Sequence, residues 1–205
     1  MRSFDPRVII LSACLPIAAV IAACSEAPPA QPAAAPAAAA APTPSPVERG
    51  RVLVQVGGCN DCHTTKKLGP DGPEPDMSKE LSGHPADIKI SGLYKAAAGS
   101  PWTIGTTDTL TAWSGAWGTT FAANLTPDPT TGLKSGAVSE ALFVQAMRTG
   151  KHIGNGRPIL PPMPWAMYSK LSEDDLKAIW AYLQSIKPVE NAVPDPIPPA
   201  GAVKK

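Results

Sequence analysis

The most regular hydrophobic pattern in the chain lies between Ser172 and Pro188. Its apolar residues recur three and four positions apart, the spacing of one helix face; they are Leu176, Ile179, Trp180, Leu183 and Ile186. Acidic residues fill positions 173–175, where the positive end of the helix dipole stabilises them. The pattern predicts an amphipathic helix that begins after Ser172 and ends before Pro188.

A second helix is predicted to begin after Ser45. Ser45 and Glu48 have the spacing of a capping box, and Pro46 suits the first helical position. The helix then runs through ERGRVLVQV and stops at the two glycines 57–58. Gly50 lies inside it at a cost of about 1 kcal/mol relative to alanine. A glycine there indicates that another element approaches closely.

A third helix is predicted over residues 139–149, and Gly150 supplies its C-terminal stop. Its apolar stripe consists of Leu142, Phe143, Ala146 and Met147. Residues 64–135, in contrast, read as loop, and a structureless loop of that length is unusual in a compact domain. We therefore expect short turns or strands around LTAWSGAWGTTFAANL, residues 110–125, packed by the tryptophans of this region.

The N-terminal segment predicts export. Arg2 and Arg7 come before about 16 apolar residues, fewer than the roughly 20 that a membrane-spanning helix needs. Residues 21–24, Ile-Ala-Ala-Cys, resemble the bacterial lipobox. This resemblance implies cleavage before Cys24 and a diacylglycerol on its sulfur. An ordinary signal peptide cut nearby and an uncleaved anchor are the alternatives.

The amino-acid composition changes along the chain and predicts four segments. After a signal peptide over residues 1–23, residues 24–45 form an Ala/Pro-rich linker, an extended spacer of about 3 Å per residue. Residues 46–188 form the folded domain, in which residues 64–120 are a loop-rich insertion. Residues 189–205 form a proline-rich tail that is expected to be extended or disordered.

Charge and amino-acid usage narrow the possible functions. The chain has 18 basic and 17 acidic residues, so the charge footprint of a nucleic-acid-binding protein is absent. It has 25 prolines and 17 glycines among 205 residues, above the average usage of roughly 12% for the two together. This composition indicates long loops and a small apolar core. A bulky cofactor would add apolar contacts to a core that is otherwise small.

The stretch Cys59-Asn60-Asp61-Cys62-His63 carries the candidate chemistry. A redox dithiol of the thioredoxin type needs a βαβ context, and a zinc site needs a second pair of ligands. The chain shows neither pattern. Cys-x-x-Cys-His is also the attachment sequence of haem c. Cys59 and Cys62 would add to the two vinyl groups from one helical turn, and His63 would place Nε2 under the iron.

A sixth iron ligand is expected from later in the chain, and Met163 is the predicted one. It lies in RPILPPMPWAMY, where prolines on both sides stiffen the backbone and keep it out of a helix. Met167, a histidine and an open site remain alternatives. The other candidates are Met77, Met147, His84 and His152, and both histidines are expected at the surface. Two interpretations of Arg157 stay open: a partner for a haem propionate and a solvated surface residue.

Together these features resemble a class I c-type cytochrome with a single haem. The resemblance covers about residues 45–190 and rests on the Cys-x-x-Cys-His motif, Pro162-Met163-Pro164 and a final helix carrying Leu176, Tyr182 and Leu183. It implies an all-α fold around one covalent haem c, with the first and last helices crossing at right angles. Residues 121–133, FAANLTPDPTTGL, and the later RTGKH and GRPILPPMPW are similar to cytochrome subunits of periplasmic dehydrogenases. The long insertion, with Leu-Ser-Gly-His-Pro at 81–85, departs from that family.

The expected function is that of an electron carrier, tethered by lipid to the periplasmic side of a bacterial membrane. It would pass single electrons between redox partner proteins, with no catalysis by this chain and no nucleic acid bound. One alternative is a cytochrome subunit of a dehydrogenase complex. The other is a haem sensor or peroxidase-like protein with an open distal site, which requires that Met163 does not bind iron.

Overall fold

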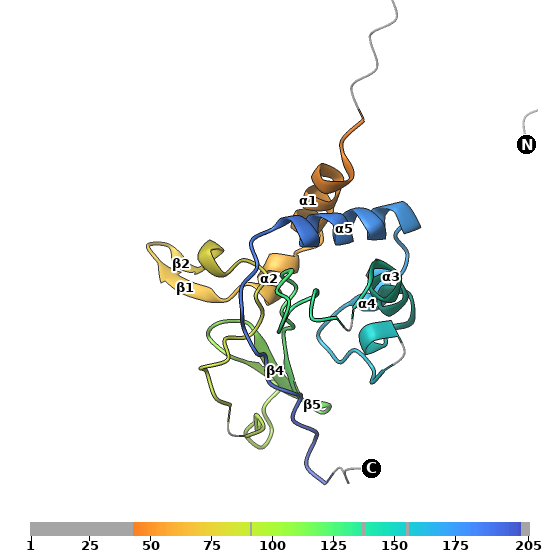
Figure 1. Ribbon diagram of the computed structural model, residues 1–205. Helices are drawn as coiled ribbons and strands as arrows, with labels where there is room; N and C mark the ends of the chain where they lie inside the picture. Colours follow the sequence, from red (N-terminus) through yellow and green to blue (C-terminus); the bar gives the residue numbers. More distant parts are fainter. Residues whose placement is uncertain (1–42, 91, 137, 155, 202–205) are drawn as a thin grey trace, which may run out of the picture. The chain divides into compact units, whose positions relative to one another are not determined.

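The structure is a computed structural model that describes residues 43–90, 92–136, 138–154 and 156–201 (Figure 1). The predicted signal peptide, Cys24 and nearly all of the predicted linker lie outside these residues. No described helix is long and apolar enough to cross a membrane.

The three predicted helices are confirmed. Helix α1 spans Pro46–Val56 and has the full capping box, in which the Ser45 side chain accepts from the Glu48 amide at 3.2 Å. Helix α3 spans Glu140–Thr149 and ends at Gly150 in the left-handed conformation. Helix α5 spans Glu173–Ser185, and Ser172 caps its N-terminus.

Helices α1 and α5 cross each other at Gly50 (Figure 1). A Cβ atom added to Gly50 would lie 1.9 Å from the carbonyl oxygen of Ala178 and 2.8 Å from Cβ of Tyr182. The missing side chain therefore lets two backbones come into contact. Arg49 and Asp175 also join the two helices, through an ion pair of 2.8 Å. These contacts account for a glycine in the middle of α1.

The prediction of an all-α fold is wrong. Strands β1 (Lys66–Gly69) and β2 (Gly72–Pro75) form one antiparallel hairpin. Strands β3 (Gly105–Thr106), β4 (Ala112–Gly115) and β5 (Gly118–Phe121) form a second antiparallel sheet in that order. These strands have four residues or fewer, so no long alternation of apolar and polar residues marks them. The strands near residues 110–125 were expected, but they make the fold mixed.

The remaining short elements complete the domain. Helix α2 spans Cys59–His63, and helix α4 spans Trp165–Tyr168. Two 3₁₀ helices, η1 and η2, span Met77–Lys79 and His152–Gly154. The core joins α1, α3 and α5 to two loop residues; its buried members are Val54, Leu81, Leu133, Phe143, Leu176, Ile179 and Leu183.

The insertion is part of the core, and His84 within it is buried. The expectation of a surface position for His84 is wrong, because the residue is 0% exposed and its ring centroid lies 4.9 Å from that of Phe121 in a tilted arrangement. Its Nε2 lies 3.1 Å from the carbonyl oxygen of Ile88, and its Nδ1 lies 2.9 Å from the hydroxyl of Thr111. A carbonyl oxygen can only accept, so Nε2 carries the proton and Nδ1 accepts from the threonine. Both nitrogens therefore have structural partners.

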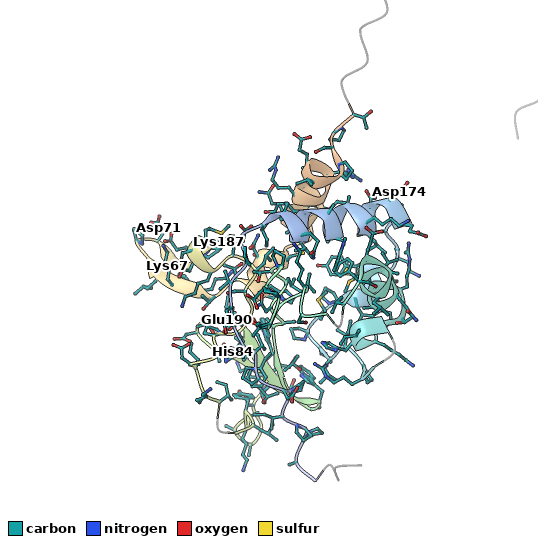
Figure 2. All side chains as sticks on the ribbon, in the orientation of Figure 1. Lys67, Asp71, His84, Asp174, Lys187 and Glu190 are labelled. Atoms are coloured by element: carbon teal, nitrogen blue, oxygen red, sulfur yellow. The ribbon has the colours of Figure 1, made fainter. Side chains whose placement is uncertain are left out.

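The chain beyond α5 is extended and bonded to the domain. In Figure 1 it runs from the end of α5 down past β4 and β5. The Asn191 side chain donates to the carbonyl oxygen of His84 at 2.9 Å, and Figure 2 labels His84 and Glu190, the residue before Asn191. Further along, Ile197 pairs with Thr119 of β5 through two backbone hydrogen bonds. We call residues 187–198 the C-terminal segment.

Candidate haem site

Helix α2 lies at the wall of a cavity of about 620 Å³. This volume falls within the roughly 300–1,000 Å³ of ligand sites in proteins. Cys59, Cys62 and His63 line the cavity from α2, and Met163 lines it from the proline-rich loop. Most of the remaining wall is apolar and comes from α3, α5, β5 and the loop after it; it includes Phe121, Leu125, Leu142, Phe143, Ile179 and Leu183.

The motif forms one short helical turn because two glycines precede it. Gly58 has φ of +66°, a conformation that glycine adopts without steric cost, and α2 begins immediately afterwards. The single turn from residue 59 to residue 62 brings both cysteine side chains to the cavity. Tyr168 of α4 donates a hydrogen bond to the Gly57 carbonyl oxygen, which fixes the glycine turn before α2 against α4.

The environment of His63 leaves one ring nitrogen available. Its Nδ1 lies 2.8 Å from the carbonyl oxygen of Ala123, which can only accept, so Nδ1 is the protonated nitrogen. Nε2 then carries the lone pair, and it forms no hydrogen bond with any described residue. Burial lowers the pKa of His63, which keeps the ring neutral. A neutral imidazole oriented through its other nitrogen is the form that binds a metal.

Gly83 in the insertion packs against the carbonyl group of Ala123 that orients His63. Its amide donates to the His63 carbonyl oxygen at 2.8 Å, and the next amide, of His84, donates to Ala122 at 2.9 Å. A Cβ atom added to Gly83 would lie 2.4 Å from the Ala122 carbonyl oxygen and 2.7 Å from that of Ala123. Sequence reasoning missed this role, although the Leu-Ser-Gly-His-Pro stretch was distinctive within the insertion.

We expect Gly83→Ala to disturb the His63 site as well as stability. The residue has φ of +81°, where a side chain costs about 1–2 kcal/mol, and the added methyl would displace residues 122 and 123. Unfolding should occur at lower denaturant, and the electron paramagnetic resonance of the ferric protein should change. Gly99→Ala is the matched control, because Gly99 has φ of +75° and no atom within 4 Å. Equal effects of the two substitutions would contradict the positioning role.

Of the four candidate methionines, two line the cavity and two do not. Met163 is half-buried in the loop between β-bridge residue Pro158 and α4, and Met147 faces the cavity from α3 and packs against the core. Met167 is 73% exposed and Met77 is 55% exposed, and neither lines the cavity. Of the histidines, His152 is exposed as expected and lies at the cavity edge. The choice of Met163 stays a prediction.

The surroundings of the two thiols disfavour the other uses of the motif. Burial raises the pKa of the Cys59 thiol to about 11 and also raises that of Cys62. A redox dithiol needs a lowered pKa, since the thiolate is the nucleophile. Among the described residues, no group of three or more His, Cys, Asp or Glu side chains is placed to hold a metal ion. The geometry therefore favours haem over both a dithiol and a zinc site.

Known proteins similar to this chain are subunits of dehydrogenases. A nicotinate dehydrogenase subunit from Pseudomonas putida is 31% identical over 148 residues, which is 72% of this chain and 9% of that protein. The gluconate 2-dehydrogenase cytochrome c subunit from Pantoea cypripedii is 30% identical over 150 residues, 73% of this chain and 25% of that protein. The cytochrome c subunit of the quinone alcohol dehydrogenase from Gluconobacter oxydans is 35% identical over 81 residues, 38% of this chain and 16% of that protein. No family model matches the chain.

The chain spans a quarter or less of the length of these relatives. The similarity therefore concerns a domain within larger proteins, and two of the three are named as cytochrome c subunits. Together with the cavity around Cys59, Cys62 and His63, these similarities support a cytochrome c domain in this chain.

Proposed function

We propose that the chain is a single-haem c-type cytochrome that carries electrons one at a time between redox partner proteins. The observation that carries this proposal is the convergence of Cys59, Cys62, His63 and Met163 on one largely apolar cavity. The relatives named as cytochrome subunits agree with an electron-carrying role.

Each of these residues has a separate part in holding the group. Cys59 and Cys62 would supply the sulfurs for two thioether bonds, while His63 would offer Nε2 from a ring fixed by the Ala123 carbonyl oxygen. Met163 offers a neutral thioether from the proline-rich loop. When bound, the haem supplies a one-electron couple at its iron, and a methionine ligand raises its reduction potential. The apolar walls exclude water from the metal and so limit solvent rearrangement when the charge changes.

With His63 and Met163 both holding the metal, a substrate would have no open position on it. We therefore propose that the chain transfers electrons without catalysing a reaction by itself. The relatives favour a specific version of this role, as the cytochrome subunit of a dehydrogenase complex. In that version a second protein oxidises the substrate and reduces this chain. Co-purification with a flavin, molybdenum or quinoprotein subunit would identify such a partner.

A reductive titration of the purified protein tests the electron-carrying function. One electron per chain should convert the oxidised spectrum fully into the reduced one, and a mild oxidant should restore it. Uptake of two or more electrons per chain, or none, would contradict a single haem that carries one electron.

We also propose that the protein is held at the periplasmic face of a membrane by a lipid on Cys24. The support is the lipobox-like sequence before Cys24 and the Ala/Pro-rich residues that follow it. Cys24→Ser should move the protein from the membrane fraction to the soluble periplasmic fraction and should abolish labelling by radioactive palmitate. Its haem content should not change. Continued membrane association of an unlabelled Cys24→Ser protein would show that another feature anchors it.

A further inference from the structure

The C-terminal segment forms part of the cavity wall, although it follows the last helix. One end is fastened by Asn191, whose side chain donates to Ser82 and His84 carbonyl oxygens at 2.7 and 2.9 Å and accepts from the Ala86 amide at 2.9 Å. The other end is fastened by Ile197, whose amide and carbonyl bond to Thr119 at 2.9 and 2.8 Å. Residues 192–195 lie between these attachments and line the cavity.

Residues of opposite charge line the cavity near this segment. Besides His63, the described lining residues that can carry positive charge are His152 and Arg157, and the carboxylate among them is Asp195. His152 and Arg157 come from one short antiparallel turn, in which the His152 amide donates to the Arg157 carbonyl oxygen at 2.8 Å. Asp195 comes from the C-terminal segment. We call these three residues the charged rim.

Most N–H donors of the Arg157 guanidinium group have no hydrogen-bond acceptor among the described residues. Its only hydrogen bond among the described residues goes to the Pro158 carbonyl oxygen at 3.3 Å, and it forms no ion pair with them. The Arg157 side chain is exposed, but partial desolvation by the cavity wall lowers its pKa, while the charge of Asp195 opposes that shift. A guanidinium has five N–H donors arranged to grip a carboxylate. Arg157 therefore has free N–H donors for a carboxylate at the edge of a largely apolar cavity.

We propose that Arg157 of the charged rim binds a carboxylate of the porphyrin, while Asp195 of the rim is a fixed charge of opposite sign to Arg157. The inference rests on the proposed haem function, because the porphyrin carries two carboxylates that must leave the apolar cavity or find a cation. The C-terminal segment holds Asp195 in place, since Asn191 and Ile197 fasten it on both sides. The rim thereby adjusts the reduction potential through charge.

The sign of each effect follows from electrostatics. Oxidation adds one positive charge at the iron, so a nearby cation disfavours the oxidised form and a nearby anion favours it. Arg157→Gln should therefore lower the reduction potential, and Asp195→Asn should raise it. Both side chains are exposed at the cavity edge, so salt should weaken both effects.

A spectroscopic redox titration at low ionic strength tests the proposal on the haem-bound protein. Arg157→Gln and Asp195→Asn should each change the ratio of oxidised to reduced protein severalfold at a fixed ambient potential, in opposite directions. A tenfold change corresponds to about 59 mV for one electron. Arg51→Gln and Asp174→Asn are the matched controls, because they remove the same charges from exposed positions on α1 and α5 that do not line the cavity. Their potentials should stay near that of the unmodified protein.

The fastening of the segment is tested by repeating the Asp195→Asn measurement in an Asn191→Ala background. Asp195→Asn should then raise the reduction potential by less than it does in the unmodified protein, because the released C-terminal segment no longer holds Asp195 at the rim. The proposal would be overturned if Arg157→Gln changed the reduction potential no more than Arg51→Gln does. It would also be overturned if Arg157→Gln and Asp195→Asn changed the reduction potential in the same direction. An undiminished Asp195 effect after Asn191→Ala would also overturn it. If the unmodified protein itself had no covalent haem, or if His63 and Met163 did not bind its iron, the proposed function would be contradicted instead.

Discussion

Met163→Ala is expected to remove the weak red absorption band that a thioether ligand gives to oxidised haem. The reduced variant should then bind carbon monoxide stoichiometrically, whereas the unmodified protein should bind none. The reduction potential should also fall, because the neutral thioether that favours the reduced iron is gone. Absorption spectra of both oxidation states, recorded with and without carbon monoxide, provide the measurement.

The other methionines serve as controls for this experiment. Met167→Ala should leave the band intact, because Met167 is 73% exposed and does not line the cavity. Met147→Leu should also preserve the band, although it alters a residue packed against the core. If the band disappears in Met147→Leu or Met167→Ala and survives in Met163→Ala, the ligand has been assigned to the wrong methionine. If the unmodified protein lacks the band and binds carbon monoxide, the open-site alternative holds.

Gly50→Ala is expected to give the largest loss of stability among single methyl additions in α1. At an exposed helical site this substitution would stabilise by about 1 kcal/mol, since alanine is the better helix former. Here the methyl would lie 1.9 Å from the Ala178 carbonyl oxygen, so α1 and α5 must separate. Overpacking typically costs about 1–3 kcal/mol, and contact with backbone atoms places this case at or above the upper end.

Denaturant unfolding of the haem-bound protein measures this loss. Gly92→Ala is the control, because its added Cβ would meet no atom within 4 Å. The unfolding midpoint should fall markedly for Gly50→Ala and stay nearly unchanged for Gly92→Ala. A Gly50→Ala protein as stable as the unmodified one would show that α1 and α5 do not meet as closely as the structure has them.

The helices were predictable because their signals are local. The capping box at Ser45, the acidic first turn of α5 and the glycine after α3 each act within a few residues of a helix end. Gly50 even indicated a close approach before the partner was known. The partner itself, the carbonyl group of Ala178, could not be named from a single residue.

The sheets and the buried insertion were not predictable in the same way. Strands of two to four residues are too short to show a period, and their stability comes from pairing with distant segments. His84 illustrates the same limit, because the partners that satisfy its ring lie at Ile88 and Thr111. The C-terminal segment has no hydrophobic period either. Its position depends on side-chain hydrogen bonds of Asn191 to the insertion.

In the candidate site, too, the residues that are adjacent in sequence could be predicted and those that are brought together by the fold could not. Cys59, Cys62 and His63 are adjacent in sequence, so their shared chemistry was visible in the motif. The groups that position them come from elsewhere: Gly83 and Ala123 for the imidazole, and Tyr168 for the turn before α2. The charged rim joins residues 152 and 157 to residue 195, and only the folded chain shows that all three line one cavity.

Covalent attachment of one haem is the central claim, and the intact mass of the purified protein tests it most directly. Protein produced in a bacterial host with a c-type haem maturation system should be heavier, by the mass of one haem, than the same protein produced without that system. The haem should stay with the polypeptide on a denaturing gel and after extraction with acidified acetone. A colourless protein with the mass of the bare polypeptide, or a pigment that acidified acetone removes, would contradict the account.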